Sequence, residues 1–469
     1  MRKRVVSLLF VVGVVYGSLW LGNDVIHGQQ FYLAILVGVI PVAICVWTIL
    51  RSKTPDKRFL LRLFVAALVV RYLLAYIIYS RHLQPFLGAD AETYDAFGNA
   101  LLQSWRGLID PNVPWLAKYT NPKTSGFGMY YFVAGIYYVI GQSPFAIQLI
   151  NCALGAGVCV VAYKITMLVY PSERVARMTA IMTAFSPSLV LWTSQGLKDG
   201  PIMLFLCLCA LFTLKVRAKV GIKNFALLLT SLLGLYTLRN YAAYIMLTAI
   251  AGALLFTMRK KFSPVHMLQG AALIIIIGLA FSYFGAGEVA RSIDPKLIQN
   301  ARVWGAKASN SGFGGDVDIT DPQAAIEYLP LGVLYVLLSP FPWMITNLRQ
   351  LITLPELMAW WLLMPIMVKG FWFAIRKRVR ESFAICTFVV GLTLAFALYQ
   401  SNAGTAYRHR SQLYPFFFIF ICIGLDQRRT AKLEKRLRMY PPAPFGMVPG
   451  AINARPLAGN PIKIQLRQG

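Results

Sequence analysis

Long apolar segments separated by short polar stretches run along almost the whole chain. A transmembrane helix needs about 20 predominantly apolar residues, and apolar runs of that length predict such helices. The sequence therefore predicts an all-α polytopic membrane protein with about 12 transmembrane helices. We place them at residues 5–22, 31–50, 59–80, 144–169, 175–193, 199–216, 224–238, 240–257, 268–285, 356–374, 382–400 and 412–425.

Two further apolar stretches, 129–141 and 329–346, are ambiguous. The first is short and aromatic, and the second contains "SPFPW", whose prolines interrupt a straight helix. Basic loops face the cytoplasm, and all the basic loops do so if both stretches stay on the outer side as interfacial or re-entrant helices. Both chain termini are then cytoplasmic. The basic segments are "MRKR", "RSKTPDKR", "KVRAKVGIK", "MRKK", "IRKRVR" and "RRTAKLEKRLR".

Composition agrees with a membrane protein, since 57% of the residues are hydrophobic and the mean hydropathy is +0.59. The net charge of +28 lies mostly in the cytoplasmic loops and tail, so we expect no nucleic-acid partner. The seven cysteines all lie in apolar segments, which predicts neither a disulfide nor a zinc framework. The basic start and first apolar run predict an uncleaved first helix.

These patterns divide the chain into five predicted parts. They are two additional N-terminal helices (1–58), a transmembrane core (59–285) with a first outer loop (81–128), a large outer loop with a re-entrant or interfacial helix (286–355), C-terminal transmembrane helices (356–427) and a basic, disordered cytoplasmic tail (428–469).

The same topology places most of the 18 acidic residues on the outer side. Ionisable groups at the ends of membrane helices are costly unless they are solvated or paired, so a cluster there predicts a functional site. Carboxylates can accept a proton or hold a divalent cation, and arginines suit phosphate oxygens. This mixture predicts chemistry on a lipid-linked phosphate. The site residues are Asp90, Glu92 and Asp95 in the first loop, Lys198 and Asp199, Arg239, Arg349, and Arg408, His409 and Arg410 in the last outer turn.

Several of these residues have a second interpretation. Asp90 can cap the helix that starts near Ala91, because Asp is a favoured N-cap. Arg408 and Arg410 can anchor the last span to lipid head groups, although positive charge is disfavoured on the outer side. Being two positions apart, they can hold one phosphate together only in an extended or turn backbone. His409 lies between two arginines, which predicts a lowered pKa and a neutral imidazole.

Two other polar features of the sequence are an acidic, Gly-rich segment and an arginine in the middle of a predicted span. Asp316, Asp318 and Asp321 lie in the Gly-rich "GFGGDVDITDP", which we interpret as a solvated turn rather than a calcium loop. Arg71 lies in the middle of the third span and cannot face lipid cheaply. It either pairs with an acid in the bundle or stabilises a phosphate in a deep cavity.

The order of these motifs resembles the GT-C glycosyltransferases, polytopic enzymes that use polyprenyl-phosphate-linked sugars. A helix runs into an acid-rich first loop, "GADAETYDAFGNAL". An interfacial helix and a second core span follow in "YYFVAGIYYVIGQSPFAIQLINCALGAGVCVVAYKI". The paired spans of "SPSLVLWTSQGLKDGPIMLFLCLCALFTLK" then bring an outer turn to the site. The resemblance covers residues 59 to 257. The stretches "SPFPW" and "AGTAYRHR" also resemble membrane proteins of bacterial polysaccharide clusters.

The resemblance implies a glycosyltransferase of the bacterial cytoplasmic membrane, with its active site on the outer face. Asp90 is then the base that activates an acceptor hydroxyl, and Arg408, Arg410, Arg239 and Lys198 compete to bind the phosphate of the polyprenyl donor. The partners it implies are the lipid-linked sugar, a glycan or lipid acceptor and membrane lipids. Many relatives carry adjacent acids or Asp-X-Asp where this chain has Asp-Ala-Glu, so the choice of base among Asp90, Glu92 and Asp95, and a divalent cation held by them, stay open.

Two other functions compete with this one. A polymerase or ligase of O-antigen type also transfers lipid-linked glycans and usually relies on a large outer loop, for which 286–355 is available. A transporter of lipid-linked oligosaccharide calls for internal repeats and intramembrane charges along a central path. The early acid motif favours the single-sugar transferase.

Overall fold

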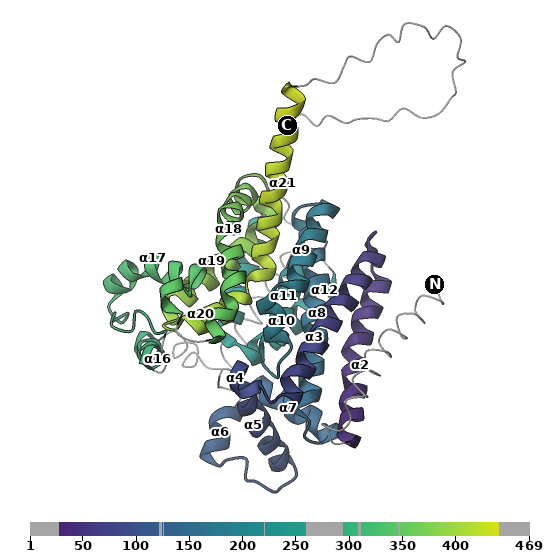
Figure 1. The fold of residues 1–469 in the computed structure, drawn as a ribbon, viewed down its shortest axis with the longest axis vertical. Coiled ribbons are helices and arrows are strands. Elements are labelled where there is room, and N and C mark those ends of the chain that lie inside the picture. Colours follow the sequence, from purple (N-terminus) through teal and green to yellow (C-terminus); the bar gives the residue numbers. More distant parts are fainter. Residues whose placement is uncertain are drawn as a thin grey trace, which may run out of the picture. The chain divides into compact units, whose positions relative to one another are not determined.

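The computed structural model of the protein describes residues 28–121, 124, 126–219, 221–258, 294–307, 311–345 and 348–439. These residues form 18 α-helices, one short 3₁₀ helix and no β-strand, which confirms the all-helical class (Figure 1). Contacts divide the chain into two units, Met1–Asp426 and Gln427–Gly469. All site residues discussed below belong to the first unit.

Ten of the twelve predicted spans fall on described residues, and 5–22 and 268–285 lie outside them. Six described helices are long and apolar enough to cross a membrane, or seven if a bent pair counts as one span. They are α2 (Gly28–Arg51), α3 (Lys57–Ser80), α8 (Pro144–Val169), α11 (Asp199–Ala218), α18 (Leu348–Lys377), α19 (Val379–Tyr399) and the pair α9 (Glu173–Phe185) with α10 (Pro187–Thr193).

The other three predicted spans correspond to helices that are shorter in their apolar part. They are α12 (Ile222–Leu238), α13 (Asn240–Met258) and α21 (Tyr414–Met439), the last of which continues into a charged segment. The ambiguous stretches form α7 (Phe127–Ile140) and the end of α17 (Pro322–Leu338) with the 3₁₀ turn Pro342–Met344, and neither helix reaches 18 residues. The count of twelve and the orientation across the membrane stay predictions.

Helix α8 is the centre of the N-terminal bundle, because 94% of its most apolar window is buried, against 22% for α2. Helices α2, α3, α9 and α11 pack around it. Small residues allow this approach: a Cβ atom added to Gly155 would collide with the side chain of Thr193 on α10. The close packing fixes α10, and with it the turn that leads into α11.

The pair α9–α10 is a broken span, bent by 54°, because Pro187 has no N–H to continue the helix. The break leaves backbone groups without partners, and two charged side chains satisfy them. Arg71 Nη1 donates to the carbonyl of Ala184 (2.8 Å) and its Nε donates to Thr193 Oγ1 (2.9 Å). On the other side, Glu356 accepts the Ser188 N–H (3.0 Å). Arg71 therefore pairs with no acid among the described residues, so the expected acid partner is wrong. Its expected role at a phosphate stays a prediction.

Short helices outside the long bundle carry the polar motifs. Helices α4 (Gln84–Gly88), α5 (Asp90–Trp105), α6 (Pro114–Thr120) and α7 gather at one end of the bundle (Figure 1). Helix α17 contacts α20 (Ala403–Ser411), which also contacts α10, and α16 (Pro295–Lys307) contacts α19. Asn402 caps α20 by accepting the N–H groups of Gly404 and Thr405. The extended or turn backbone expected for "YRHR" is wrong, because the cap starts a helix there.

Candidate active site

Helix α5 sorts the three acids of the first loop onto different faces. Successive residues turn by about 100°, so Asp90 and Tyr94 share one face, while Glu92 and Asp95 share another. Asp90 is the first residue of the helix, Ala89 occupies the N-cap position, and no side chain there makes a capping hydrogen bond. The capping interpretation of Asp90 is therefore wrong, and its carboxylate has a different partner.

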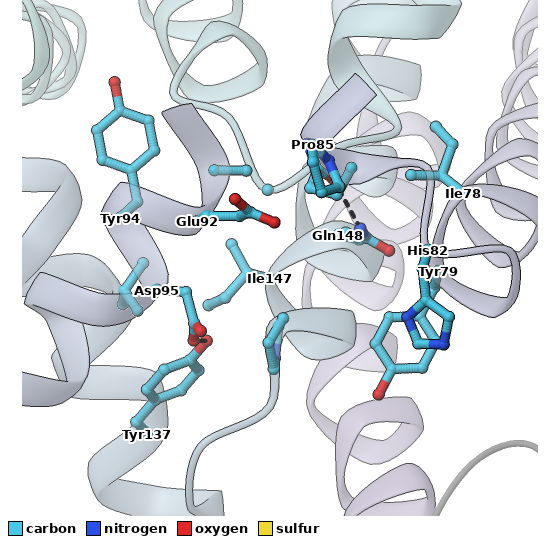
Figure 2. Close-up of a pocket in the computed structure, with 15 residues that line it drawn as sticks. Ile78, Tyr79, His82, Pro85, Glu92, Tyr94, Asp95, Tyr137, Ile147 and Gln148 are labelled. Atoms are coloured by element: carbon cyan, nitrogen blue, oxygen red, sulfur yellow. Dashed lines mark hydrogen bonds between the residues drawn. The ribbon is translucent and has the colours of Figure 1, made fainter. Parts of the chain in front are cut away.

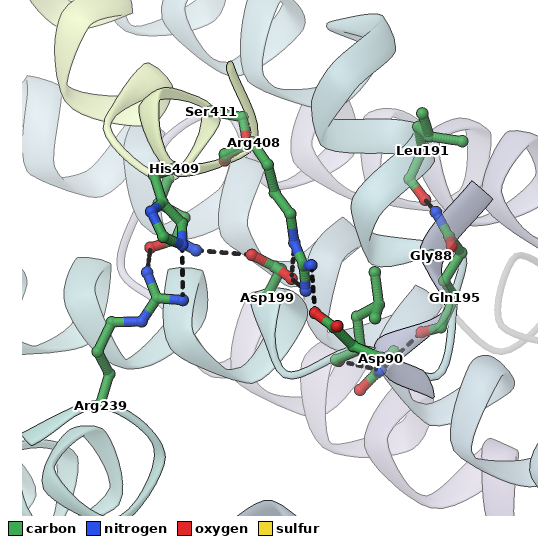
Figure 3. Close-up of polar contacts among 12 residues, drawn as sticks. Gly88, Asp90, Leu191, Gln195, Asp199, Arg239, Arg408, His409 and Ser411 are labelled. Carbon is green, nitrogen blue, oxygen red and sulfur yellow. Dashed lines mark hydrogen bonds and ion pairs between the residues drawn. The ribbon is translucent and has the colours of Figure 1, made fainter. Parts of the chain in front are cut away.

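That partner is Arg408 of α20, 318 positions away in the chain (Figure 3). Arg408 Nη1 lies 2.6 Å from Asp90 Oδ2, while its Nε and Nη2 lie 2.9 and 2.6 Å from Asp199 Oδ2. Asp199 is fully buried, whereas the Asp90 side chain is 55% exposed. Two carboxylates thus share one guanidinium, one fixed in the interior and one at the surface. They raise the pKa of Arg408 against the opposing effect of its burial.

A polar chain extends this ion pair to a second arginine. Gln412 Nε2 donates to Asp199 Oδ1 (2.6 Å), and Arg239 Nη1 donates to Gln412 Oε1 (2.6 Å). Arg239 Nη2 also lies 3.3 Å from His409 Nε2 (Figure 3). Because arginine only donates, Nε2 accepts. The Gln400 amide lies 2.6 Å from the other ring nitrogen, Nδ1, so a proton there requires this amide to present its oxygen to the ring. Burial, followed by the charges of Arg239, Arg408 and Lys198, lowers the pKa of His409 well below its usual value. This direction agrees with the lowered pKa predicted from the sequence, although burial is its largest cause.

Lys198 completes the cationic side of the cluster. Its Nζ lies 5.9 Å from the ring centroid of Tyr94, and a Cβ on Gly126, whose φ is +90°, would come within 2.9 Å of it. Burial and the charges of Arg239 and Arg408 lower the pKa of Lys198 to about 8, although Asp199 and Asp90 oppose the shift. Among the described residues its ammonium has no hydrogen-bond or ion-pair partner. Three basic and two acidic side chains meet here, so the cluster keeps an excess positive charge that suits an anion.

The other face of α5 borders a cavity of about 430 Å³ (Figure 2). Glu92 and Asp95 line it, and Asp90 does not. Asp95 Oδ1 accepts a hydrogen bond from the Tyr137 hydroxyl (2.6 Å), and both its oxygens accept from Gln142 (3.1 Å). The metal site suggested for Asp90, Glu92 and Asp95 is not assembled, since no described residues form a group of three metal-ligating side chains.

Arg410 lies apart from the Arg408 cluster and is fully buried. Its Nη1 donates to the carbonyl oxygens of Leu337 and Ser339 (2.8 Å each), and its Nε lies 3.3 Å from the Tyr414 hydroxyl. These carbonyls end α17, so Arg410 satisfies a helix terminus. Its expected role as a donor-phosphate ligand is wrong, because helical geometry turns it away from Arg408.

The remaining sequence-predicted residues lie elsewhere. The side chain of Arg349 in α18 is outside the described residues. Asp321 caps α17 by accepting the N–H groups of Gln323 and Ala324, and Asp318 accepts from Thr320 (2.7–2.9 Å). Local turn and cap contacts of this kind agree with the solvated-turn interpretation of this loop.

Sequence reasoning missed the neutral members of the site. Gln412 carries the link between Asp199 and Arg239, and Trp192 packs its ring 5.4 Å from the Arg408 guanidinium carbon. Glu356, which has no role in the sequence prediction, accepts from Ser186 Oγ (2.6 Å) and from the Tyr407 hydroxyl (2.5 Å). Their only sequence signal is proximity to "YRHR" and to the "SPS" break.

Residues 124–284 match the family model of dolichyl-phosphate-mannose-protein mannosyltransferases, a family of the GT-C superfamily. The expected resemblance to GT-C proteins is confirmed over this stretch, which is about a third of the chain. It includes Lys198, Asp199 and Arg239, whereas Asp90 and Arg408 lie outside it. No curated protein and no solved structure shows significant similarity to the chain.

Proposed function

We propose that this protein is a membrane glycosyltransferase that moves a hexose or pentose from a polyprenyl-phosphate donor to a glycan or lipid acceptor. The observation that carries the proposal is the convergence of Asp90 with Arg408, Arg239 and Lys198, which come from distant parts of the chain. The match to mannosyltransferases of the dolichyl-phosphate class supports it. We place the reaction at the outer face of a bacterial cytoplasmic membrane, following the positive-inside pattern.

The donor phosphate binds between Arg408 and Lys198. Arg408 keeps its buried partner Asp199 through Nε and Nη2, and only Nη1 is engaged by the exposed Asp90. A phosphate can therefore take the place of Asp90 at Nη1 without disturbing the interior pair. Charge-assisted hydrogen bonds to phosphate are stronger than neutral ones, and Lys198 adds an ammonium that has no other ion-pair partner among the described residues.

Asp90, released from Arg408, then acts as the general base. The acceptor hydroxyl oxygen attacks the anomeric carbon, the bond from that carbon to the phosphate oxygen breaks, and the hydroxyl proton passes to Asp90. The electron pair of the broken bond leaves on polyprenyl phosphate, whose added negative charge Arg408 and Lys198 stabilise. Attack opposite the leaving group inverts the configuration at the anomeric carbon.

The test is sugar transfer by the purified full chain in lipid nanodiscs. Radiolabelled polyprenyl-phosphate hexoses and pentoses are supplied one at a time with an extract of envelope glycans and lipids. The proposal expects label to move from at least one donor to an acceptor fraction with release of polyprenyl phosphate, and Asp90→Asn to stop it. Transfer that proceeds equally in Asp90→Asn, or only from nucleotide sugars, would contradict the proposal.

A further inference from the structure

The cavity beside Glu92 and Asp95 of α5 is lined by a set of polar groups separate from the Arg408 cluster. We propose that it binds the acceptor and that the group it holds is a neutral, hydroxyl-rich sugar ring. This inference rests on the proposed function. Its evidence is independent of the Arg408 cluster, because it comes from the hydrogen-bond acceptors that line the cavity.

A chain of three glutamine amides fixes the first of these acceptors. Gln195 Nε2 donates to the Leu191 carbonyl (3.0 Å), Gln84 Nε2 donates to Gln195 Oε1 (2.9 Å), and Gln148 Nε2 donates to Gln84 Oε1 (3.1 Å). The carbonyl at the end can only accept, so every amide in the chain must point the same way. Gln148 Oε1 is left as the free end.

The free end lies at the cavity. Gln148 is 2% exposed and lines the cavity, and its Oε1 is buried without a hydrogen-bond partner among the described residues. Figure 2 shows this oxygen on the side facing His82 and Tyr79, which also line the cavity. A buried acceptor without a donor is costly, and a ligand that supplies a donor removes that cost.

Glu92 provides a second free acceptor. Its side chain is exposed at the cavity (Figure 2), and its carboxylate has no hydrogen-bond or ion-pair partner among the described residues. The neighbouring Asp95 is occupied by Tyr137 and Gln142. Gln148 Oε1 and the Glu92 carboxylate are therefore acceptors without donors, while the Tyr79 hydroxyl and the His82 imidazole of the same lining can donate or accept. The two carboxylates repel an anion. A ligand rich in hydroxyl groups, which both donate and accept, fits this mixture, while the rings of Tyr79 and Tyr137 offer apolar surface to the C–H faces of a sugar.

The cavity also lies in a suitable place for an acceptor. Its volume is within the range of small-molecule sites, about 300–1,000 Å³. Tyr94 lines it and also lies against Lys198 of the phosphate cluster, and Gly196 of the same wall is two residues before Lys198. Tyr94 is thus a wall shared by the cavity and the phosphate cluster, and it lies one helical turn after Asp90 on α5.

Binding without turnover tests this inference separately from the proposed function. Methyl glycosides of common hexoses and pentoses are titrated into the purified full chain in nanodiscs, and binding is followed by saturation-transfer NMR. We expect at least one glycoside to bind, and Gln148→Leu to weaken it about threefold to tenfold, the effect of one lost neutral hydrogen bond. Glu92→Gln should weaken it as well. The control Gln103→Leu makes the same change on α5 away from the cavity lining and should leave the dissociation constant unchanged.

Arg408→Lys serves as the second control, since it alters the phosphate cluster and should leave glycoside binding intact. No binding of any glycoside above empty nanodiscs, or equal binding by the parent, Gln148→Leu and Glu92→Gln, would overturn the inference. So would a clear preference for tetramethylammonium over the glycosides, because a cation site needs no hydroxyls. If Gln148→Leu unfolds, Glu92→Gln at the exposed side decides. Glycoside binding with the expected pattern, but without sugar transfer, would contradict the proposed function and still support this binding site.

Discussion

Two places in this protein collect charged side chains, and they use them differently. At the broken span, Arg71 and Glu356 bind backbone groups freed by Pro187 and do not bind each other. At the cluster around Arg408, Asp90 and Asp199 both bind its guanidinium, and Lys198 beside them has no ion-pair partner among the described residues. The first arrangement completes secondary structure, and the second holds charge next to the surface.

The difference shows which buried charges belong to folding and which to chemistry. A charge that satisfies a helix end has a fixed partner that no ligand can replace without breaking the helix. A charge paired with an exposed carboxylate can exchange that partner for a ligand. Arg408 has one partner of each kind, the buried Asp199 and the 55% exposed Asp90, and we therefore expect the reaction at Arg408 and stability at Arg71.

The largest effect should come from Asp90. Asp90→Asn keeps the shape of the side chain but removes the proton acceptor, and general-base catalysis is worth about 10²–10⁴ in rate. We expect the sugar-transfer rate to fall by that factor while the unfolding midpoint hardly changes. The control is Asp110→Asn, because among the described residues Asp110 only accepts the N–H of Asn112, in a local turn. Equal rates for the Asp90→Asn and Asp110→Asn proteins would remove Asp90 from the chemistry.

A smaller effect, on stability, should come from Arg71. Arg71→Met has a similar length but leaves the Ala184 carbonyl without its donor, which costs about 1–3 kcal/mol of unfolding free energy. Thermal unfolding in detergent measures this loss against Arg62→Met, an exposed arginine of the same helix. Full stability of Arg71→Met together with lost sugar transfer would show that the comparison between the two regions is wrong.

The smallest effect should be the pH dependence caused by Lys198. Its pKa is lowered to about 8, so the ammonium that attracts the donor phosphate is lost as the pH rises through 8. We expect the donor KM to rise about threefold to tenfold between pH 7 and pH 9, and Lys198→Gln to remove this pH dependence. Lys198→Arg should remove it as well, since arginine stays charged.

Stability should respond to the same group with the opposite sign. The usual lysine pKa is 10.5, so between about pH 8 and 10.5 the unfolded chain binds the proton that the folded protein has lost. The contribution of Lys198 to the unfolding free energy therefore rises with pH over this window while donor binding weakens. Unfolding curves of the parent and Lys198→Gln between pH 7 and pH 10 check this, and parallel pH profiles for the two proteins would contradict it.

The sequence allowed the helical class and most charged members of the cluster to be predicted. Hydropathy finds the long helices, and positive charge on the outer side is rare enough to single out Arg239 and Arg408. Whether Asp90 or Glu92 meets Arg408 could not be predicted, because it depends on the residue at which α5 begins. A start one residue later would have made Asp90 the cap.

Arg408 and Arg410 show the same limit. They are two positions apart in one motif, and only the helical conformation of α20 sends one to Asp90 and the other to the carbonyls of Leu337 and Ser339. Those carbonyls come from a segment about 70 residues away. Gln412 and Gln148 are uncharged, so hydropathy and charge patterns do not single them out. Their roles depend on contacts with amide and acidic side chains of other helices.

The most direct test of the central claim is binding of polyprenyl phosphate, the leaving group shared by all donors of this class. Its dissociation constant is measured for the parent, Arg408→Lys and Arg410→Lys proteins in nanodiscs of neutral lipid. The cluster predicts that Arg408→Lys binds about tenfold more weakly, because lysine cannot present a planar fork to Asp199 and phosphate together, while folded Arg410→Lys binds like the parent. Unchanged binding by Arg408→Lys, or a larger loss in Arg410→Lys, would contradict the assignment of the phosphate site.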